Sequence, residues 1–200
     1  MSILPDPDET TKHLVGWAQR LRDKDVQWQG LAQDGVRLFK ELVMSRQMPF
    51  AFETVFSHWK LLNDGRYESK VDDIRQMQSN GYFVVLLFVG LTSPDLSAMR
   101  VATRVSQGGH DIPYDKLLER FPRTQAAIGA AATVADLTIM FDNSRDPGSA
   151  FSLVRAQKKR RVLFDARDPA YSTPEPLLRV CRPWLDNVVG TFKAPRKTKA

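Results

Sequence analysis

The sequence has little cysteine and little histidine, and this scarcity excludes several classes of protein. Cys181 is the one cysteine among 200 residues, so an internal disulfide framework is excluded and a reducing compartment is expected. The three histidines, His13, His58 and His110, lie far apart in the sequence, and no cysteine–histidine cluster of the kind that binds zinc is present. The chain is therefore neither a small disulfide-stapled domain nor a zinc-binding module.

The sequence also lacks a recognisable targeting or membrane segment. Residues 1–8 have neither a basic start nor an apolar run, which argues against a signal peptide. The longest apolar run, residues 82–91, is too short to span a bilayer. We therefore expect a soluble, cytoplasmic protein with no membrane partner.

The composition is that of a globular domain with a basic end. Hydrophobic residues make up 42% of the chain and charged residues 26%, values that argue against wholesale disorder. We assign residues 1–190 to a single domain and 191–200 to a basic disordered tail. Much of the formal net charge of +6 comes from this tail and from residues 158–161. Because no nucleic-acid motif accompanies these clusters, nucleic acid is not the partner we expect.

Apolar runs alternate with helical patterns along the chain, which predicts an α/β fold. The predicted strands are 48–52, 82–91, 137–141 and 161–164. The predicted helices are 12–23, 25–46, 67–80, 93–105, 114–121, 125–135 and 173–184. Because the strand runs are continuously apolar and are separated by helices, we expect a parallel sheet sandwiched between helices.

Polar residues follow the first predicted strand directly. Glu53 and Thr54 come after residues 48–52. In an open α/β sheet the carboxyl ends of parallel strands face the ligand crevice, so a carboxylate and a hydroxyl at that place are candidate site groups. The alternative is that these residues begin a solvated loop or cap the next helix.

Several arginines surround a glycine hinge, Gly108-Gly109-His110. Arg104 precedes the hinge, and Arg120 and Arg123 follow it. Phosphoryl transfer requires positive side chains over the phosphates, and a helix–hinge–helix lid can supply them on closure. We interpret these three arginines as phosphate contacts. For Arg100 we favour a solvated helix face, the commoner fate of a surface arginine.

Five short motifs occur in a fixed order between about residues 34 and 144. They are Phe50-Ala51-Phe52-Glu53-Thr54, Gly81-Tyr82 before the strand that ends in Phe88-Val89-Gly90-Leu91, Ser93-Pro94, Arg104-Val105-x-x-Gly108-Gly109-His110-x-Ile112-Pro113, and Phe141-Asp142-Asn143-Ser144. Each motif alone is weak. Together they resemble the zeta-toxin family of P-loop small-molecule kinases.

This resemblance implies a kinase that transfers phosphate from ATP, with Mg²⁺, to a hydroxyl of a small acceptor, a UDP-linked amino sugar for the toxins of the family. The catalytic candidates that it implies are Glu53, Thr54, Arg120 and Arg123. The nucleotide-binding candidates are Arg104, His110, Asp142 and Asn143. Asp142 and Asn143 would lie near the adenine, although they equally fit a cap of the following turn. The resemblance also suggests an antitoxin protein as a partner.

The chain departs from the family in one serious respect. The family's phosphate-binding loop, Gly-x-x-x-x-Gly-Lys-Ser/Thr, occurs nowhere in these 200 residues. In the family this loop follows a central strand, and both would precede residue 1 here. Without them the backbone amides, the lysine and the hydroxyl that hold phosphate and Mg²⁺ are missing, so neither the metal ligands nor the catalytic base can be assigned.

Three interpretations of this departure remain. We favour a kinase truncated at its N-terminus, with impaired activity. The alternatives are a degenerate relative that binds a protein partner or nucleic acid through its basic surface, and a sheet reorganised for another function. On the kinase interpretation, residues 50–52, 84–89 and 138–141 form parallel strands with Glu53 and Asp142 at one edge. The sheet is also expected to show a gap, or an unusual neighbour, where the central strand belongs.

Overall fold

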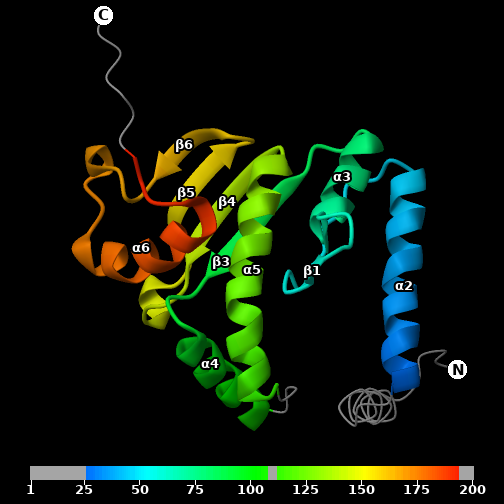
Figure 1. Cartoon of the computed structure of the whole chain (residues 1–200), viewed down its shortest axis with the longest axis horizontal. Helices are drawn as coiled ribbons and strands as arrows, with labels where there is room; N and C mark the ends of the chain where they lie inside the picture. The colour runs from blue at the N-terminus through cyan, green and yellow to red at the C-terminus, as the bar shows by residue number, and fades with distance from the viewer. Residues whose placement is uncertain (1–25, 108–111, 194–200) are drawn as a thin grey trace, which may run out of the picture. The chain divides into compact units, whose positions relative to one another are not determined.

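The computed structural model describes residues 26–107 and 112–193, and its elements fall into two compact units (Figure 1). The smaller unit contains α2 (Val26–Ser45), the residues that follow it as far as Phe52, and the last residues of α4 (Pro94–Ser106). The larger unit contains the other strands and helices. The helix predicted at 12–23 lies outside the described residues.

The segment after α2 is not a strand, and the prediction of a strand at 48–52 is wrong. The Met48 amide instead donates to the Val43 carbonyl at 3.0 Å and closes the end of the helix. The Phe50 and Phe52 rings stack at 5.9 Å, and the Lys40 ammonium lies 4.8 Å from the centre of the Phe52 ring. An aromatic run becomes a strand only where another strand pairs with it, and here the rings pack on each other and on the helix.

The larger unit begins with a short hairpin, in which β1 (Trp59–Leu61) pairs antiparallel with β2 (Tyr67–Ser69). The Trp59 and Tyr67 rings stack at 4.5 Å across the two strands. Gly65 has a φ of +79° in the connecting turn, a conformation that favours glycine. Residues 67–69, which were predicted to form the first turn of a helix at 67–80, form β2 of this hairpin instead.

The helix after the hairpin, α3 (Val71–Ser79), ends as the sequence predicts. Gly81 has a φ of +85°, and the Tyr82 amide donates to the Met77 carbonyl at 3.1 Å. A glycine in the left-handed conformation, with a hydrogen bond back into the last turn, is a common way of closing a helix. The chain then turns into the main sheet.

The main sheet has the strand order β3-β4-β5-β6. Its members are β3 (Val85–Gly90), β4 (Leu137–Asp142), β5 (Ser152–Lys158) and β6 (Arg161–Asp165). β3 and β4 are parallel, whereas β5 is antiparallel to both β4 and β6. The fold is therefore mixed α/β, and the expectation of a wholly parallel sheet is wrong.

The antiparallel half of the sheet has a simple cause. Two residues, Lys159 and Arg160, join β5 to β6, and a connection of this length allows only an antiparallel hairpin. Lys159 has a φ of +51°, as such a tight turn requires. The sequence predicted β6 but not β5, because Arg155 and Gln157 interrupt the apolar pattern of that strand.

Two helices, α4 and α5 (Tyr114–Val134), connect β3 to β4. The predicted cap of α4 is confirmed, since the Ser93 hydroxyl accepts a hydrogen bond from the Leu96 amide at 3.2 Å. α5 is continuous through Pro122, where two separate helices were predicted. An interior proline costs a helix about 3 kcal/mol, and burial of the apolar face of the second half, including Ala127 and Ile128, offsets this cost.

α5 and α6 (Glu175–Val189) cover one face of the main sheet (Figure 1). Met140 of β4 and Leu185 of α6 are fully buried in the core between them. Gly129 of α5 allows the two helices to approach closely, because a Cβ atom there would lie 2.3 Å from the Val188 carbonyl oxygen of α6. The core of the larger unit therefore lies between the sheet and these two helices.

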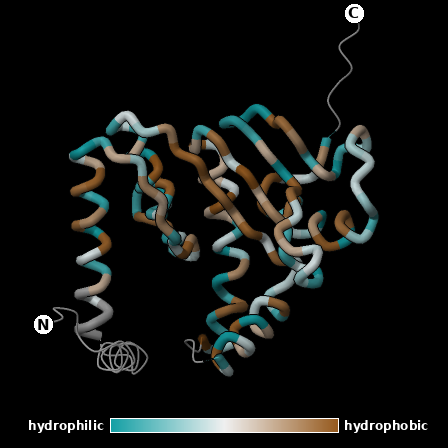
Figure 2. Tube along the Cα trace, turned by 180° about the vertical axis from the view of Figure 1, so that it is seen from behind, coloured by the Kyte–Doolittle hydropathy of each residue, from teal (hydrophilic) through white to brown (hydrophobic). Residues whose placement is uncertain are grey.

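The opposite face of the sheet carries apolar side chains that the larger unit does not cover. Val85, Leu87 and Val89 of β3 are 46%, 62% and 42% exposed. Figure 2 shows this side, with hydrophobic residues along the strands and no helix of the larger unit in front of them. In the described sheet β3 pairs only with β4, over six residue pairs, so no gap lies inside the sheet and the unpaired position is the outer edge of β3.

We predict that Gly90→Ala destabilises the larger unit by about 1–3 kcal/mol, because it overpacks a filled site. A Cβ atom at Gly90 would lie 2.5 Å from the indole of Trp184, which is 1% exposed and cannot move aside. Urea unfolding followed by tryptophan fluorescence measures the change. Gly148→Ala is the matched control, since open space surrounds that position, and an equal loss of stability in the two variants would contradict the prediction.

Candidate functional site

The carboxyl ends of β3 and β4 lie together at one edge of the sheet. Gly90 and Asp142 are register partners at the ends of the two parallel strands. The chain continues from them into two loops, and the Thr92 amide of the first donates to the Ser144 hydroxyl of the second at 2.9 Å. The prediction that Asp142 ends a parallel strand at this edge is therefore confirmed.

The Asp142 carboxylate organises this edge. It is completely buried and accepts hydrogen bonds from the Ser144 amide at 2.9 Å, from the Ser144 hydroxyl at 2.9 Å and from the indole N–H of Trp184 at 2.8 Å. These bonds hold the turn after β4 against α6. Asp142 thus has the turn-capping role that the sequence left open beside adenine contact.

Arg100 of α4 belongs to the same edge. Its guanidinium donates to the Asn143 carbonyl, 43 residues further along the chain. The side chain is exposed, as the sequence led us to expect, but it joins the start of the crossover to the loop after β4. The sequence could not show this, because the contact depends on β3 and β4 being neighbours.

The other candidate arginines differ in the hydrogen bonds and ion pairs that their side chains make. Arg123 pairs with Glu119 one turn earlier in α5. The Arg120 side chain is exposed, and its guanidinium makes no hydrogen bond or ion pair within residues 26–107 and 112–193. Arg104 is exposed in the last turn of α4, and His110 lies outside the described residues. Arg120 therefore presents the freest guanidinium on α5.

A hydrogen bond joins the first turn of α5 to the start of α4. The Tyr114 hydroxyl donates to the Asp95 carboxylate, and this bond raises the pKa of Tyr114. α4 begins four residues after β3 ends, so the start of α5 is also tied to the carboxyl edge of the sheet (Figure 1). The arginines in the first half of α5 thus lie on a helix anchored at this edge.

Glu53 and Thr54 do not end a strand. Glu53 is exposed and Thr54 half-buried, in a segment without helix or strand. The prediction that Glu53 shares the carboxyl edge of a parallel sheet with Asp142 is wrong, because the strand that was to carry Glu53 there does not form. In the same segment, His58 contacts Glu68 of β2 at 3.2 Å.

Metal-ligating side chains do not gather into a cluster in the part of the chain that the structure describes. Within residues 26–107 and 112–193, no group of three or more His, Cys, Asp or Glu side chains is placed to hold a metal. Asp142, the carboxylate at the carboxyl edge, already accepts three hydrogen bonds.

Within residues 26–107 and 112–193, no helix is long and apolar enough to cross a membrane.

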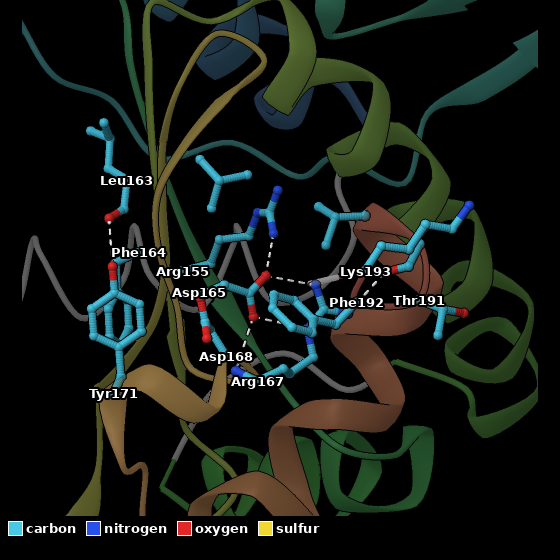
Figure 3. Close-up of a pocket in the computed structure, with 13 residues that line it drawn as sticks. Arg155, Leu163, Phe164, Asp165, Arg167, Asp168, Tyr171, Thr191, Phe192 and Lys193 are labelled. Atoms are coloured by element: carbon cyan, nitrogen blue, oxygen red, sulfur yellow. Dashed lines mark hydrogen bonds and ion pairs between the residues drawn. The ribbon is translucent and has the colours of Figure 1, made fainter. Parts of the chain in front are cut away.

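A buried ionic network in β5 and β6 was not predicted. Asp165 is 2% exposed and accepts from both Arg155 and Arg167 (Figure 3). Arg167 also donates to Asp186 of α6. Arg155 and Asp165 are register partners on adjacent antiparallel strands. Because the sequence pattern did not predict β5, it gave no indication that Arg155 and Asp165 would lie on neighbouring strands.

The network depresses the pKa of Asp165. Burial raises this pKa, but hydrogen bonds from Arg167 and the charges of Arg167 and Arg155 lower it by more, so the net shift is downward. A carboxylate whose pKa is depressed in the folded state contributes stability above its ordinary pKa of 3.8. That stability is lost as the pH falls through the folded-state pKa.

Asp142→Ala should destabilise the larger unit, because it leaves the buried Trp184 N–H and the Ser144 amide and hydroxyl without their acceptor. Each buried group left unsatisfied costs about 1–3 kcal/mol. Thermal unfolding by circular dichroism measures the change. Asp146→Ala, at an exposed position in the same loop, should leave the melting temperature nearly unchanged, and a similar fall for both variants would refute this role for Asp142.

Asp165→Asn should lower the free energy of unfolding at pH 7 by about 3–5 kcal/mol, since it leaves buried guanidinium charge uncompensated. The free energy of unfolding should also fall less steeply at acidic pH, because the variant has no carboxylate at this position to protonate below pH 3.8. Denaturant titrations between pH 7 and pH 2 test both points. Asp168→Asn, which retains an oxygen to accept from the Ala170 amide, is the control; a fall at acidic pH as steep for Asp165→Asn as for the wild type would disprove the assignment.

Comparisons with protein-family models, with curated proteins and with solved structures find no match to this chain.

Proposed function

We propose that the chain forms the lid-bearing part of a zeta-toxin-like small-molecule kinase, which transfers phosphate from ATP to a hydroxyl, with a UDP-linked amino sugar as the first acceptor to test. The observation that supports this proposal is the β3–α4–α5–β4 unit, in which helices rich in arginine connect two parallel neighbouring strands. In α/β sheets, ligands bind at the carboxyl ends of such strands.

The carboxyl edge has features that suit phosphate. α4 begins at this edge, and the dipole of a helix favours negative charge at its N-terminus, where the Ser93 hydroxyl already accepts from the Leu96 amide. Arg120 follows on the next helix with its guanidinium unpaired, and a planar fork of N–H donors matches the oxygens of a phosphate. In this proposal Arg123, three residues further along the same helix, is the second lid arginine.

The missing phosphate-binding loop has to come from outside these 200 residues. The open edge of β3 supports this requirement, because its backbone groups can pair with one more strand. Three side chains of β3, Val85, Leu87 and Val89, are between 42% and 62% exposed, although the strand has the continuous apolar sequence of a strand covered on both faces. An added strand with its helix would remove this apolar surface from water, a gain of about 25 cal/mol per Å².

The same open edge favours a second candidate function, a non-catalytic module that binds a protein partner such as an antitoxin. Adding a strand to an exposed edge is a common mode of protein recognition. The two candidates differ in what a strand and loop supplied at this edge would do. A kinase would gain ATP binding and phosphate transfer, whereas an interaction module would gain stability alone.

The chain by itself should bind Mg-ATP weakly and transfer no phosphate, because it has no loop to hold the triphosphate. We expect both activities to appear when the chain is joined to a strand followed by Gly-x-x-x-x-Gly-Lys-Ser/Thr and a helix. Calorimetry with Mg-ATP and a phosphate-transfer assay with UDP-N-acetylglucosamine measure them. A joined protein that folds but neither binds nor transfers would refute the kinase proposal, and so would tight binding by the chain alone.

In that joined protein, Arg120→Ala should lower turnover by about 10³-fold, the effect of arginines that stabilise transferring phosphate in nucleotide hydrolases. The loss should lie in kcat more than in KM, since charge supplied on closure acts on the transition state. Arg120→Lys keeps the charge but not the fork and should recover only part of the rate. Arg182→Ala, an exposed position on α6, is the control, and near-full turnover of Arg120→Ala would remove Arg120 from the site.

A further inference from the structure

A cavity of about 390 Å³ opens beside the buried ionic network (Figure 3). Its walls come from β6, from the 3-10 turn η2 (Pro169–Tyr171) and from the residues that follow α6. All of these elements belong to the larger unit. A volume of this size lies in the range of small-molecule binding sites, about 300–1,000 Å³.

The polar part of the lining is a guanidinium that is only half satisfied. Arg155 is 9% exposed; its Nε donates to Gln157 at 2.7 Å and its Nη1 donates to Asp165. Its Nη2 makes no hydrogen bond to any residue within 26–107 and 112–193. In Arg167, in contrast, each of the three guanidinium nitrogens donates, to Asp165, to Asp186 or to the Gly190 carbonyl. One nearly buried donor edge in the lining thus remains available.

The lining carries a small excess of positive charge, with Arg155, Arg167 and Lys193 against Asp165 and Asp168. Asp186, outside the lining, pairs with Arg167. Burial lowers the pKa of the Arg155 guanidinium, the Asp165 charge raises it, and the neighbouring Arg167 charge lowers it further, so the net shift is downward. Lys193 has no ion pair among the described residues. Asp168 opposes this positive charge, but its Oδ1 accepts the Ala170 amide at 3.0 Å, in the turn of η2.

The remaining lining is aromatic and aliphatic. Phe164 and Tyr171 meet edge to face, with ring centres 4.7 Å apart, and the Tyr171 hydroxyl donates to the Leu163 carbonyl at 3.2 Å. Phe192 lies against the Arg167 guanidinium at 5.8 Å. In Figure 3 the first two rings stand on one side of the network and Phe192 on the other. Rings held in this way present apolar walls at a small cost in side-chain entropy.

We propose that this cavity binds a small aromatic anion, a ring that carries a carboxylate or a phosphate. The anionic group takes the free Nη2 edge of Arg155 and the Lys193 ammonium. The ring packs among Phe164, Tyr171 and Phe192. This site shares no residue with the proposed kinase site and does not depend on it.

The test uses phenyl phosphate and benzoate as probes, with benzyl alcohol and inorganic phosphate as matched compounds that lack the charge and the ring. We expect the two aromatic anions to bind with a dissociation constant of about 1 mM or tighter, the range open to ligands of this size. The matched compounds should bind at least about tenfold more weakly. NMR titration should shift the Arg155 Nε–H signal and the amides of residues 189–193.

Variants at two exposed lining positions test the binding site without removing a buried group from the core. Lys193→Ala and Tyr171→Ala should each weaken the binding of phenyl phosphate by about fivefold or more, a loss of about 1 kcal/mol. Arg182→Ala, exposed on α6 outside the cavity, should change nothing. Benzyl alcohol or inorganic phosphate binding as tightly as phenyl phosphate would overturn the proposal. So would unchanged affinity in both cavity variants, or shifts confined to residues outside the cavity.

Discussion

The larger unit depends on one buried carboxylate. Asp142 closes β4, and its three hydrogen bonds reach the next turn and the indole of Trp184. Ser144, which is one of those partners, also holds the loop after β3 through the Thr92 amide. Gly90 completes the arrangement, because only a residue without a side chain leaves room for the indole beside β3. Two strand ends and a helix are thus fixed by a single buried side chain, which accepts three hydrogen bonds.

Sequence reasoning succeeded where the signal was local or strongly periodic. The apolar run that became β3, the Ser93 cap and the Gly81 helix end all follow from a few adjacent residues. It failed where the outcome depended on a distant partner. The run at 48–52 resembles a strand but has no strand to pair with, and β5 contains Arg155 and Gln157, whose burial makes sense only beside Asp165 and the Ala132 carbonyl. α5 remains whole through Pro122 because burial of its second half outweighs a local penalty.

The candidate site was predictable to the same degree. That Asp142 would stand at the carboxyl end of a parallel strand followed from the apolar run before it. That its oxygens would be taken up by Trp184, 42 residues away, did not. The likeness to a kinase lid rests on arginines near a glycine hinge, and of these the structure ties Arg123 to Glu119 and leaves Arg120 unpaired. Arg100 is exposed, as predicted, but its guanidinium also joins α4 to the loop after β4, a contact that the sequence did not indicate.

The exposed apolar face and unpaired edge of β3 in the described sheet affect how the protein behaves in a cell. An open strand edge next to apolar side chains is the surface through which sheets associate without control, and natural proteins normally cover or blunt it. A folded chain with this surface uncovered presents to chaperones and proteases much of what they recognise in a misfolded one. A partner that covered the strand would therefore protect the folded chain, and loss of that partner would lower its abundance.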